Sequence, residues 1–243
     1  MKQALTRPRK SILKALLALL LFFFVFQSLF WVVEVYLFNY RNPNTTAFIR
    51  TYLNKCPVTG KDCPFEQFWK PLNEIAPPLQ EAVLIGEDDR FFEHEGIDTE
   101  AMEESLEANL KKKKIIRGGS TITQQLAKNL FLSSSKNPFR KIKEIVMALL
   151  MEKMLSKARI LEIYLNVIEW GKGIYGAEAA SLHYFGKSAK NLSSDEAAYL
   201  AAIIPNPQLY TSKQSRRAEK RKTILLKRMR NRSFEELKNN SWL

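Results

Sequence analysis

Metal ligands are scarce in this sequence. Its 243 residues include two cysteines, Cys56 and Cys63, and two histidines. A zinc site needs four such side chains at a suitable spacing, and these four do not provide them. Six residues separate the cysteines, so the spacing fits either a short-loop disulfide in an oxidising compartment or two free thiols. The chain also has no Walker loop, which excludes the common P-loop nucleotide site.

Negative charge is also in short supply. Lysine and arginine number 38 against 25 acidic residues, which gives a net charge of +13, and hydrophobic residues make up 46% of the chain. The hydrophobic content predicts a folded chain with one good core. The positive balance indicates an anionic partner, which is a nucleic acid, a phospholipid surface or a phosphorylated substrate.

A long apolar run follows a basic N-terminus. Residues 1–10 carry four basic side chains, whereas residues 15–33 contain only Gln27 and Ser28 as polar residues. About 20 apolar residues span a bilayer, so residues 11–36 are expected to form one transmembrane helix with a cytoplasmic N-terminus. A cleaved signal peptide is the alternative, but this run is longer than usual and no small-residue cleavage site follows it.

A retained anchor narrows the choice of anionic partner. It places the rest of the chain outside the cytoplasm, which argues against nucleic acid and favours lipid head groups or a lipid-linked phosphate. The double proline 77–78 marks a boundary, and the pattern after it is helical. We therefore expect five segments: a basic cytoplasmic N-terminus (1–10), a transmembrane anchor (11–36), a membrane-proximal linker (37–78), a catalytic domain (79–212) and a basic C-terminal helix (213–243).

The decapeptide Glu87–Gly96 concentrates reactive side chains. It follows the apolar run 82–85 and contains several acids, an arginine, two phenylalanines and a histidine. Carboxylates beside an apolar run are candidates for a raised pKa and for acid/base chemistry. A solvated helix end with its aromatic residues packed beneath it is the alternative.

A glycine turn opens the next helical segment, 117–131. Ser120 is expected to cap that helix, in which Ile122 and its successors form an apolar stripe. Thr121, Gln125 and Lys128 recur at helical spacing on the opposite face. Hydroxyl, amide and ammonium groups after a glycine turn suit an anion or a sugar.

A third segment combines a charged pair with an apolar run. Arg140 and Glu144 stand four residues apart and can form an ion pair. Residues 145–151 are apolar almost all round, which predicts a helix buried on every side. Glu144 then lies where the helix enters the core, either as a salt-bridge partner or as a second carboxylate that faces a site.

The C-terminal third reads as further helices, at 157–167, 175–184 and 195–204, with 170–173 as a flexible turn beside a cleft. The tail from residue 213 to residue 232 carries ten basic residues and one acidic residue. It could lie on anionic lipid or be a solvated helix.

These segments resemble the peptidoglycan glycosyltransferases (glycosyltransferase family 51) in their monofunctional, membrane-anchored form. The resemblance rests on separated motifs in one order: Glu87-Asp88-x-x-Phe91-x-x-His94-x-Gly96, then Gly119-Ser120-Thr121-x-Thr123-Gln124-Gln125-x-x-Lys128-Asn129, then Arg140-Lys141-x-x-Glu144, then Lys157-x-x-Ile160-Leu161-Glu162-x-Tyr164-Leu165-Asn166. The family's last motif is matched only loosely by the C-terminal tail. The resemblance implies an all-α, lysozyme-like fold with a small membrane-associated jaw subdomain, preceded by one transmembrane helix.

The resemblance also implies a reaction, the polymerisation of lipid II into β-1,4-linked glycan strands at the cytoplasmic (inner) membrane. Glu87 would be the general base, Lys128 and Arg140 would neutralise the leaving diphosphate, and Glu144 would orient Arg140, hold a divalent metal (Mg or Mn), or both. No tightly bound cofactor is expected. The substrate-binding residues implied are Asp88, Phe91, His94, Ser120, Thr121, Gln124, Gln125, Lys128, Asn129 and Arg140, with His94 fixing the Glu87 loop.

The partners implied are lipid II, the growing glycan chain, membrane phospholipid and other proteins of cell-wall synthesis or division, with no nucleic acid. Two rival functions stay open on the sequence. A lysozyme-like lytic transglycosylase would share the fold and a catalytic glutamate, but it has no use for cations that face a diphosphate. A non-catalytic, membrane-anchored cell-wall scaffold would not depend on Glu87.

Overall fold

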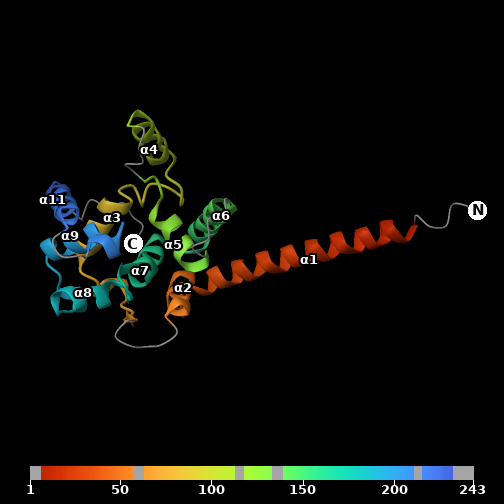
Figure 1. The fold of residues 1–243 in the computed structure, drawn as a ribbon, viewed down its shortest axis with the longest axis horizontal. Helices are drawn as coiled ribbons and strands as arrows, with labels where there is room; N and C mark the ends of the chain where they lie inside the picture. The colour runs from red at the N-terminus through yellow and green to blue at the C-terminus, as the bar shows by residue number, and fades with distance from the viewer. Residues whose placement is uncertain (1–6, 57–62, 113–117, 133–138, 211–214, 232–243) are drawn as a thin grey trace, which may run out of the picture. The chain divides into compact units, whose positions relative to one another are not determined.

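A computed structural model describes residues 7–56, 63–112, 118–132, 139–210 and 215–231 (Figure 1). The chain divides into two compact units, residues 1–41 and 42–243.

The first unit is the single long helix α1 (Arg7–Leu37). Its segment Ser11–Leu37 has a mean hydropathy of 2.6 and is the one helix of the described residues that is long and apolar enough to cross a membrane. At about 1.5 Å per residue, 27 residues extend roughly 40 Å, which exceeds the ~30 Å hydrocarbon core. This helix is consistent with the expected single-pass anchor.

The second unit consists mainly of short helices, so the expected all-helical fold is confirmed. Its elements in chain order are α2 (Ala47–Lys55), β1 (Glu66–Gln67), the 3₁₀ turn η1 (Leu72–Glu74), α3 (Pro77–Glu87), α4 (Thr99–Lys111), α5 (Ile122–Phe131), α6 (Phe139–Met154), α7 (Lys157–Val167), β2 (Glu169–Gly171), β3 (Ile174–Tyr175), α8 (Ala177–Phe185), the 3₁₀ turn η2 (Ala189–Asn191), α9 (Ser194–Ile203), α10 (Pro207–Tyr210) and α11 (Arg216–Arg230).

The core forms around α3. Pro77 opens this helix, as a proline at the first position can, and residues 79–85 are all buried. α3 packs against α9 and α11, while α5 packs against α6 and α7. The end of α3 is therefore held in the middle of the unit, and Glu87 is its last residue.

The expected turn at 170–173 is confirmed at Lys172 and Gly173, whereas Trp170 and Gly171 lie in strand β2 (Glu169–Gly171). These residues belong to a hairpin, β2–β3, whose strand β3 also pairs in parallel with β1. Trp170 is fully buried and its indole N–H donates to the Leu200 carbonyl at 3.2 Å. Gly173 has φ +77°, and a Cβ there would meet the Pro64 carbonyl oxygen at 1.8 Å, so only glycine fits this close approach.

The same segment has the spacing Gly171-x-Gly173-x-x-Gly176, which is that of a dinucleotide-binding loop. Its glycines connect two antiparallel strands rather than a strand and a helix of a βαβ unit. The pattern therefore has no phosphate-binding geometry here.

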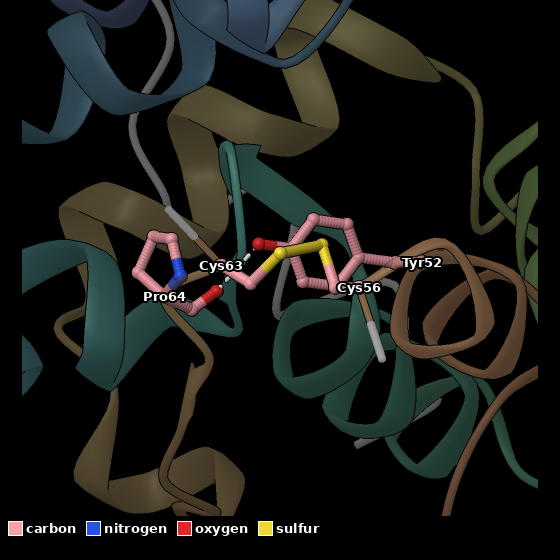
Figure 2. Close-up of a disulfide and its surroundings, with 4 residues drawn as sticks. All are labelled: Tyr52, Cys56, Cys63 and Pro64. Carbon is pink, nitrogen blue, oxygen red and sulfur yellow. Dashed lines mark hydrogen bonds between the residues drawn. A yellow bond between two sulfur atoms is a disulfide. The ribbon is translucent and has the colours of Figure 1, made fainter. Parts of the chain in front are cut away.

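A disulfide joins Cys56 to Cys63, with 5.7 Å between their Cα atoms, which resolves the two alternatives left by the spacing (Figure 2). It connects the end of α2 to the approach of β1. Close by, the Tyr52 hydroxyl donates to the Pro64 carbonyl at 2.6 Å. α2 is thereby fastened to the hairpin.

Helix α6 is not buried on every side, so that expectation is wrong. Met147, Ala148 and Met151 are buried, but an apolar stripe on the other face is exposed. The stripe comprises Phe139, Ile142, Val146 and Leu149, which are 66%, 59%, 56% and 41% exposed. One apolar face of α6 therefore packs in the core, and the other forms an exposed apolar surface.

Candidate active site

An open cavity of about 1030 Å³ lies within the second unit. Its wall is built from the end of α3, the start of α6, and parts of α2, α4, α5, α7, β2, α10 and α11. It collects most of the residues singled out in the sequence, namely Glu87, Asp88, Ser120, Thr121, Gln125, Lys128, Asn129, Arg140 and Glu144. Phe91, His94 and Gln124 are not part of the wall.

Glu87 is a buried carboxylate with both oxygens engaged. Its side chain is 9% exposed. Oε1 accepts from Arg221 Nη2 at 2.7 Å, and Oε2 accepts from Gln125 Nε2 at 3.0 Å. The Tyr164 hydroxyl donates to Gln125 Oε1 at 2.9 Å and so fixes which way that amide points.

The surroundings of Glu87 act on its pKa in opposite directions. Burial raises the pKa, Arg221 and the Gln125 hydrogen bond lower it, and the net result lies above the ordinary value of 4.5. A carboxylate that is more basic than usual, yet held ready by a cation, suits a general base.

Arg221 is the functional residue that sequence reasoning missed. It lies on α11, the helix predicted as a lipid-bound or solvated tail, which instead packs on α3 and α9. Arg221 also donates to the Gly86 carbonyl, and Arg228 donates to the Ile85 carbonyl, both at 2.8 Å. Two arginines therefore satisfy carbonyls at the end of α3.

The second carboxylate, Glu144, lies among cations. Lys141 Nζ donates to Glu144 Oε1 at 2.5 Å and to Ser120 Oγ at 3.3 Å, while Arg140 Nη1 is 4.0 Å from Oε2. The same charged side chains act on the pKa of Lys128. Burial and the nearby Arg140 lower this pKa, and Glu144 raises it. Three cations against one buried carboxylate leave this part of the wall with an excess positive charge.

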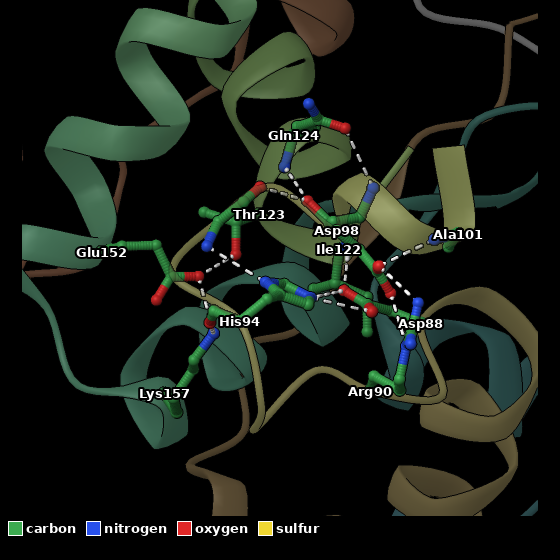
Figure 3. A network of polar contacts seen from close by, with 12 residues as sticks. Asp88, Arg90, His94, Asp98, Ala101, Ile122, Thr123, Gln124, Glu152 and Lys157 are labelled. Carbon is green, nitrogen blue, oxygen red and sulfur yellow. Dashed lines mark hydrogen bonds and ion pairs between the residues drawn. The ribbon is translucent and has the colours of Figure 1, made fainter. Parts of the chain in front are cut away.

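Asp88 lies at the wall and pairs with His94, which lies behind it (Figure 3). The Gly96 N–H donates to His94 Nδ1 at 3.0 Å, so that nitrogen carries no proton, and Nε2 donates to the Asp88 carboxylate at 3.0 and 3.1 Å. Asp88 Oδ2 also accepts from the Ile122 N–H at 2.8 Å. The pair thus ties the end of α3 to the start of α5, as expected for a histidine that fixes the Glu87 loop.

The expected cap at Ser120 is wrong by one residue. Thr121 caps α5: its Oγ1 accepts from the Gln124 N–H at 3.1 Å, and the Gln124 side chain accepts from the Thr121 N–H at 3.1 Å. Gln124 is therefore buried in a capping box, which explains its absence from the cavity wall. Ser120 stays at the wall beside Lys141.

The fourth motif supports the Glu87 loop from below (Figure 3). Lys157 Nζ donates to the His94 carbonyl at 2.6 Å and to Glu152 at 2.9 Å, and Glu152 also accepts from Thr123 at 2.6 Å. The same ammonium group lies 4.5 Å from the centre of the Phe91 ring. Phe91 is 1% exposed, so it packs under the site and does not line it.

The arrangement as a whole joins a basic, buried carboxylate to a separate cluster of cations in one cavity. The carboxylate can take a proton from a hydroxyl, and the cations can stabilise an anionic leaving group. The fold and site are therefore those of a group-transfer enzyme whose leaving group is anionic.

Comparison with known proteins gives the family. The transglycosylase family model matches residues 52–230. The chain is 46% identical over 213 residues to a protein of Nitrosospira multiformis, covering 87% of this chain and 92% of that one. It is 44% identical over 217 residues to a protein of Chromobacterium violaceum, covering 89% and 95%. Both are named biosynthetic peptidoglycan transglycosylase. The chain belongs to the transglycosylase family.

Proposed function

We propose that this protein polymerises lipid II into β-1,4-linked glycan strands, with release of polyprenyl diphosphate, in cell-wall synthesis. The observation that carries the proposal is the single cavity in which Glu87 and the cations around Glu144 lie on different parts of the wall. The names of its relatives, biosynthetic peptidoglycan transglycosylases, support the same substrate class.

Glu87 acts as the base in this proposal. It takes the proton from the acceptor sugar's 4-hydroxyl as that oxygen attacks the donor's anomeric carbon. Burial raises the pKa of the carboxylate and makes it more basic, while Arg221 favours its ionised form. Gln125, held by Tyr164, fixes the carboxylate plane.

Lys128 and Arg140 neutralise the departing diphosphate. A diphosphate is already a good leaving group, so it needs charge stabilisation more than a proton. The bond between the anomeric carbon and the diphosphate oxygen breaks as the new glycosidic bond forms. A single displacement inverts the anomeric carbon, which gives a β-linked strand from an α-linked donor.

The residues around Glu144 do not fit a resident divalent metal. Among the described residues no group of three histidine, cysteine or acidic side chains could hold a metal ion. Glu144 is one carboxylate among three cations, and Lys141 contacts it directly. We therefore assign charge neutralisation in the substrate-free site to the lysine and arginine side chains; an Mg²⁺ or Mn²⁺ ion that arrives with the diphosphate would need only Glu144 and phosphate oxygens.

Two features support a place at the inner membrane. α1 is long and apolar enough to span the bilayer, and the basic residues before it favour a cytoplasmic N-terminus with the catalytic unit outside. The exposed apolar stripe on α6 fits the membrane-associated jaw that the family resemblance implies.

The test is glycan polymerisation by the full-length protein in detergent with purified lipid II. Wild type should form polymer. Glu87→Gln should lower kcat by about 10²–10⁴-fold, because the general base is lost. Glu93→Gln is the matched control, since Glu93 lies in the same loop and its side chain is exposed.

Two results would overturn the proposal. A wild-type protein that cuts preformed murein without making polymer would be a hydrolase. Wall function that survives Glu87→Gln in cells, without polymerisation by wild type in vitro, would indicate a non-catalytic scaffold.

A further inference from the structure

One carboxylate on the cavity wall, Glu169, has no part in the proposed reaction. Glu169 belongs to β2 and lines the cavity together with Ile168, Ile204, Pro205 and Pro207. This part of the wall is therefore apolar except for one acid. It differs from the part around Glu144, where cations predominate.

Helix α2 connects the two parts of the wall. Phe48 lies under Lys128, with 5.4 Å between the ammonium nitrogen and the ring centre. Tyr52, one turn further along α2, is close enough to Glu169 for the carboxylate charge to raise the tyrosine pKa, an effect second to burial. Phe48 and Tyr52 stand four residues apart, about one helical turn, so α2 lies beside both the cations and Glu169.

Glu169 has no counter-cation among the described residues. Its hydrogen-bond donor is the side chain of Gln208, from α10, with Nε2 3.0 Å from Oε1. α10 packs on β2, so the pair is held by two elements that contact each other. Burial raises the pKa of Glu169 and the Gln208 hydrogen bond lowers it, with a net rise. A partly desolvated acid on a cavity wall accepts hydrogen bonds strongly and repels anions.

We propose that Glu169 and Gln208 form a subsite for an uncharged sugar ring of the glycan, with Glu169 accepting from a hydroxyl or amide N–H. A sugar ring supplies such donors together with an apolar C–H face, and Ile168 and Pro205 provide the matching apolar surface. A diphosphate would be repelled from this wall and attracted to the cations near Glu144. The two parts of the wall thus hold sugar and diphosphate in different places.

This inference rests on the proposed function, because it assumes a glycan in the cavity. The sugar ring has two sources, the acceptor lipid II or the donor strand already made. Both present the same chemistry to Glu169, so only separate kinetics for acceptor and donor distinguish them.

The first measurement is binding without catalysis. Saturation-transfer NMR with the β-1,4-linked tetramer of N-acetylglucosamine should detect binding to full-length Glu87→Gln protein, in which turnover is blocked. Adding Glu169→Ala to that background should weaken binding about tenfold or more, which corresponds to one charge-assisted hydrogen bond. Glu169→Gln should retain part of the affinity, since its amide oxygen still accepts.

The second measurement is steady-state polymerisation by wild type, Glu169→Ala and Gln208→Ala. One series varies lipid II as the acceptor, at a fixed concentration of a lipid-linked tetrasaccharide whose terminal 4-hydroxyl is blocked so that it can only donate; the other series varies the blocked tetrasaccharide at fixed lipid II. We expect a raised KM, with kcat changed by less than about threefold, for whichever ligand occupies the subsite. A raised KM for lipid II as acceptor assigns the acceptor, and one for the tetrasaccharide assigns the donor strand.

The outcomes separate the two proposals. If wild type makes no polymer, the proposed function fails, whatever the tetramer does. If wild type polymerises but Glu169→Ala binds the tetramer normally and keeps both KM values, the subsite is refuted. Matching melting temperatures for wild type and Glu169→Gln show that the fold is intact.

Discussion

Lys141, rather than Arg140, is the cation in direct contact with Glu144: its Nζ lies 2.5 Å from Oε1, whereas Arg140 Nη1 is 4.0 Å from Oε2. The sequence spacing had suggested the reverse, a pair between Arg140 and Glu144. Lys141 therefore positions the carboxylate, and the Arg140 guanidinium remains at the cavity wall for a ligand.

We therefore expect Arg140 to bind the diphosphate of the glycosyl donor. Arg140→Gln should raise the KM for lipid II by roughly 10–100-fold, because hydrogen bonds to a charged group contribute about 1.5–3 kcal/mol. Initial rates over a range of lipid II concentrations would measure it. Lys143→Gln is the matched control, since it removes the same charge from the same helix at an exposed position. Equal KM changes in the two variants would show that the effect comes from net charge and not from a contact between Arg140 and the ligand.

Arg221 should control the pH dependence of the reaction. It lowers the pKa of Glu87 against the effect of burial, so Arg221→Gln should raise that pKa. The acidic limb of the kcat/KM profile, below which Glu87 is protonated, would then move to higher pH. Arg228→Gln is the comparison, because Arg228 also clamps α3 but does not touch Glu87. An acidic limb that stays in place in Arg221→Gln would show that the ion pair is not present in solution.

Ionisation of Glu87 should lower the stability of the folded protein. Its pKa is higher in the folded protein than the ordinary 4.5, so the folded state binds the proton more tightly than the unfolded state. Stability therefore falls as pH rises from 4.5 through the folded pKa. Glu87→Gln should melt higher than wild type above that interval, by roughly 2–4 °C for each kcal/mol gained, and the gain should vanish near pH 4.

Asp98 should have the opposite effect on stability, because its pKa is lowered in the folded protein. Burial would raise its pKa, but the Ala101 N–H and Arg90 together hold it below the ordinary 3.8. Asp98→Asn should therefore lower the melting temperature at neutral pH, and the loss should disappear as the pH falls below 3.8. Melting curves of both variants from about pH 2 to pH 8 cover both intervals and test the two signs together.

The disulfide should stabilise the attachment of α2. Closing a loop this short is worth about 2–3 kcal/mol in the chain-entropy model. The Cys56→Ser, Cys63→Ser double variant should melt lower than wild type, and a reductant should lower wild type to the same value. Thiol alkylation followed by gel electrophoresis checks the bond. A melting temperature unaffected by reductant would show that Tyr52 and its bond to Pro64 suffice.

Local patterns predicted the helices well, and non-local contacts were missed. Residues 157–167 were predicted as a helix from periodicity alone, and α7 has those bounds. The sequence did not predict the hairpin around Trp170, because its strands are only two and three residues long. They are stabilised by pairing with β1, about a hundred positions earlier. Short strands of this kind carry no periodic signal.

The site shows the same limit at the level of single residues. Glu87, Lys128 and Glu144 could be found because each sits in a distinctive local run, and the structure brings them to one cavity. Ser120 and Thr121 both carry hydroxyls, so the sequence could not tell which of them caps α5. Arg221 was hidden among ten basic residues of the tail, and only tertiary packing distinguishes it from its neighbours.

Glu87 and its ion-pair partner Arg221 are 134 positions apart in the sequence, so they are synthesised at different times. A chain is synthesised from its N-terminus, so Glu87 exists long before the helix that supplies its counter-charge. Until α11 docks, the carbonyls of Ile85 and Gly86 also lack their arginine donors. A chain that ends before α11 lacks all of these contacts, and we expect it to be inactive because the end of α3 that carries Glu87 is then unsupported.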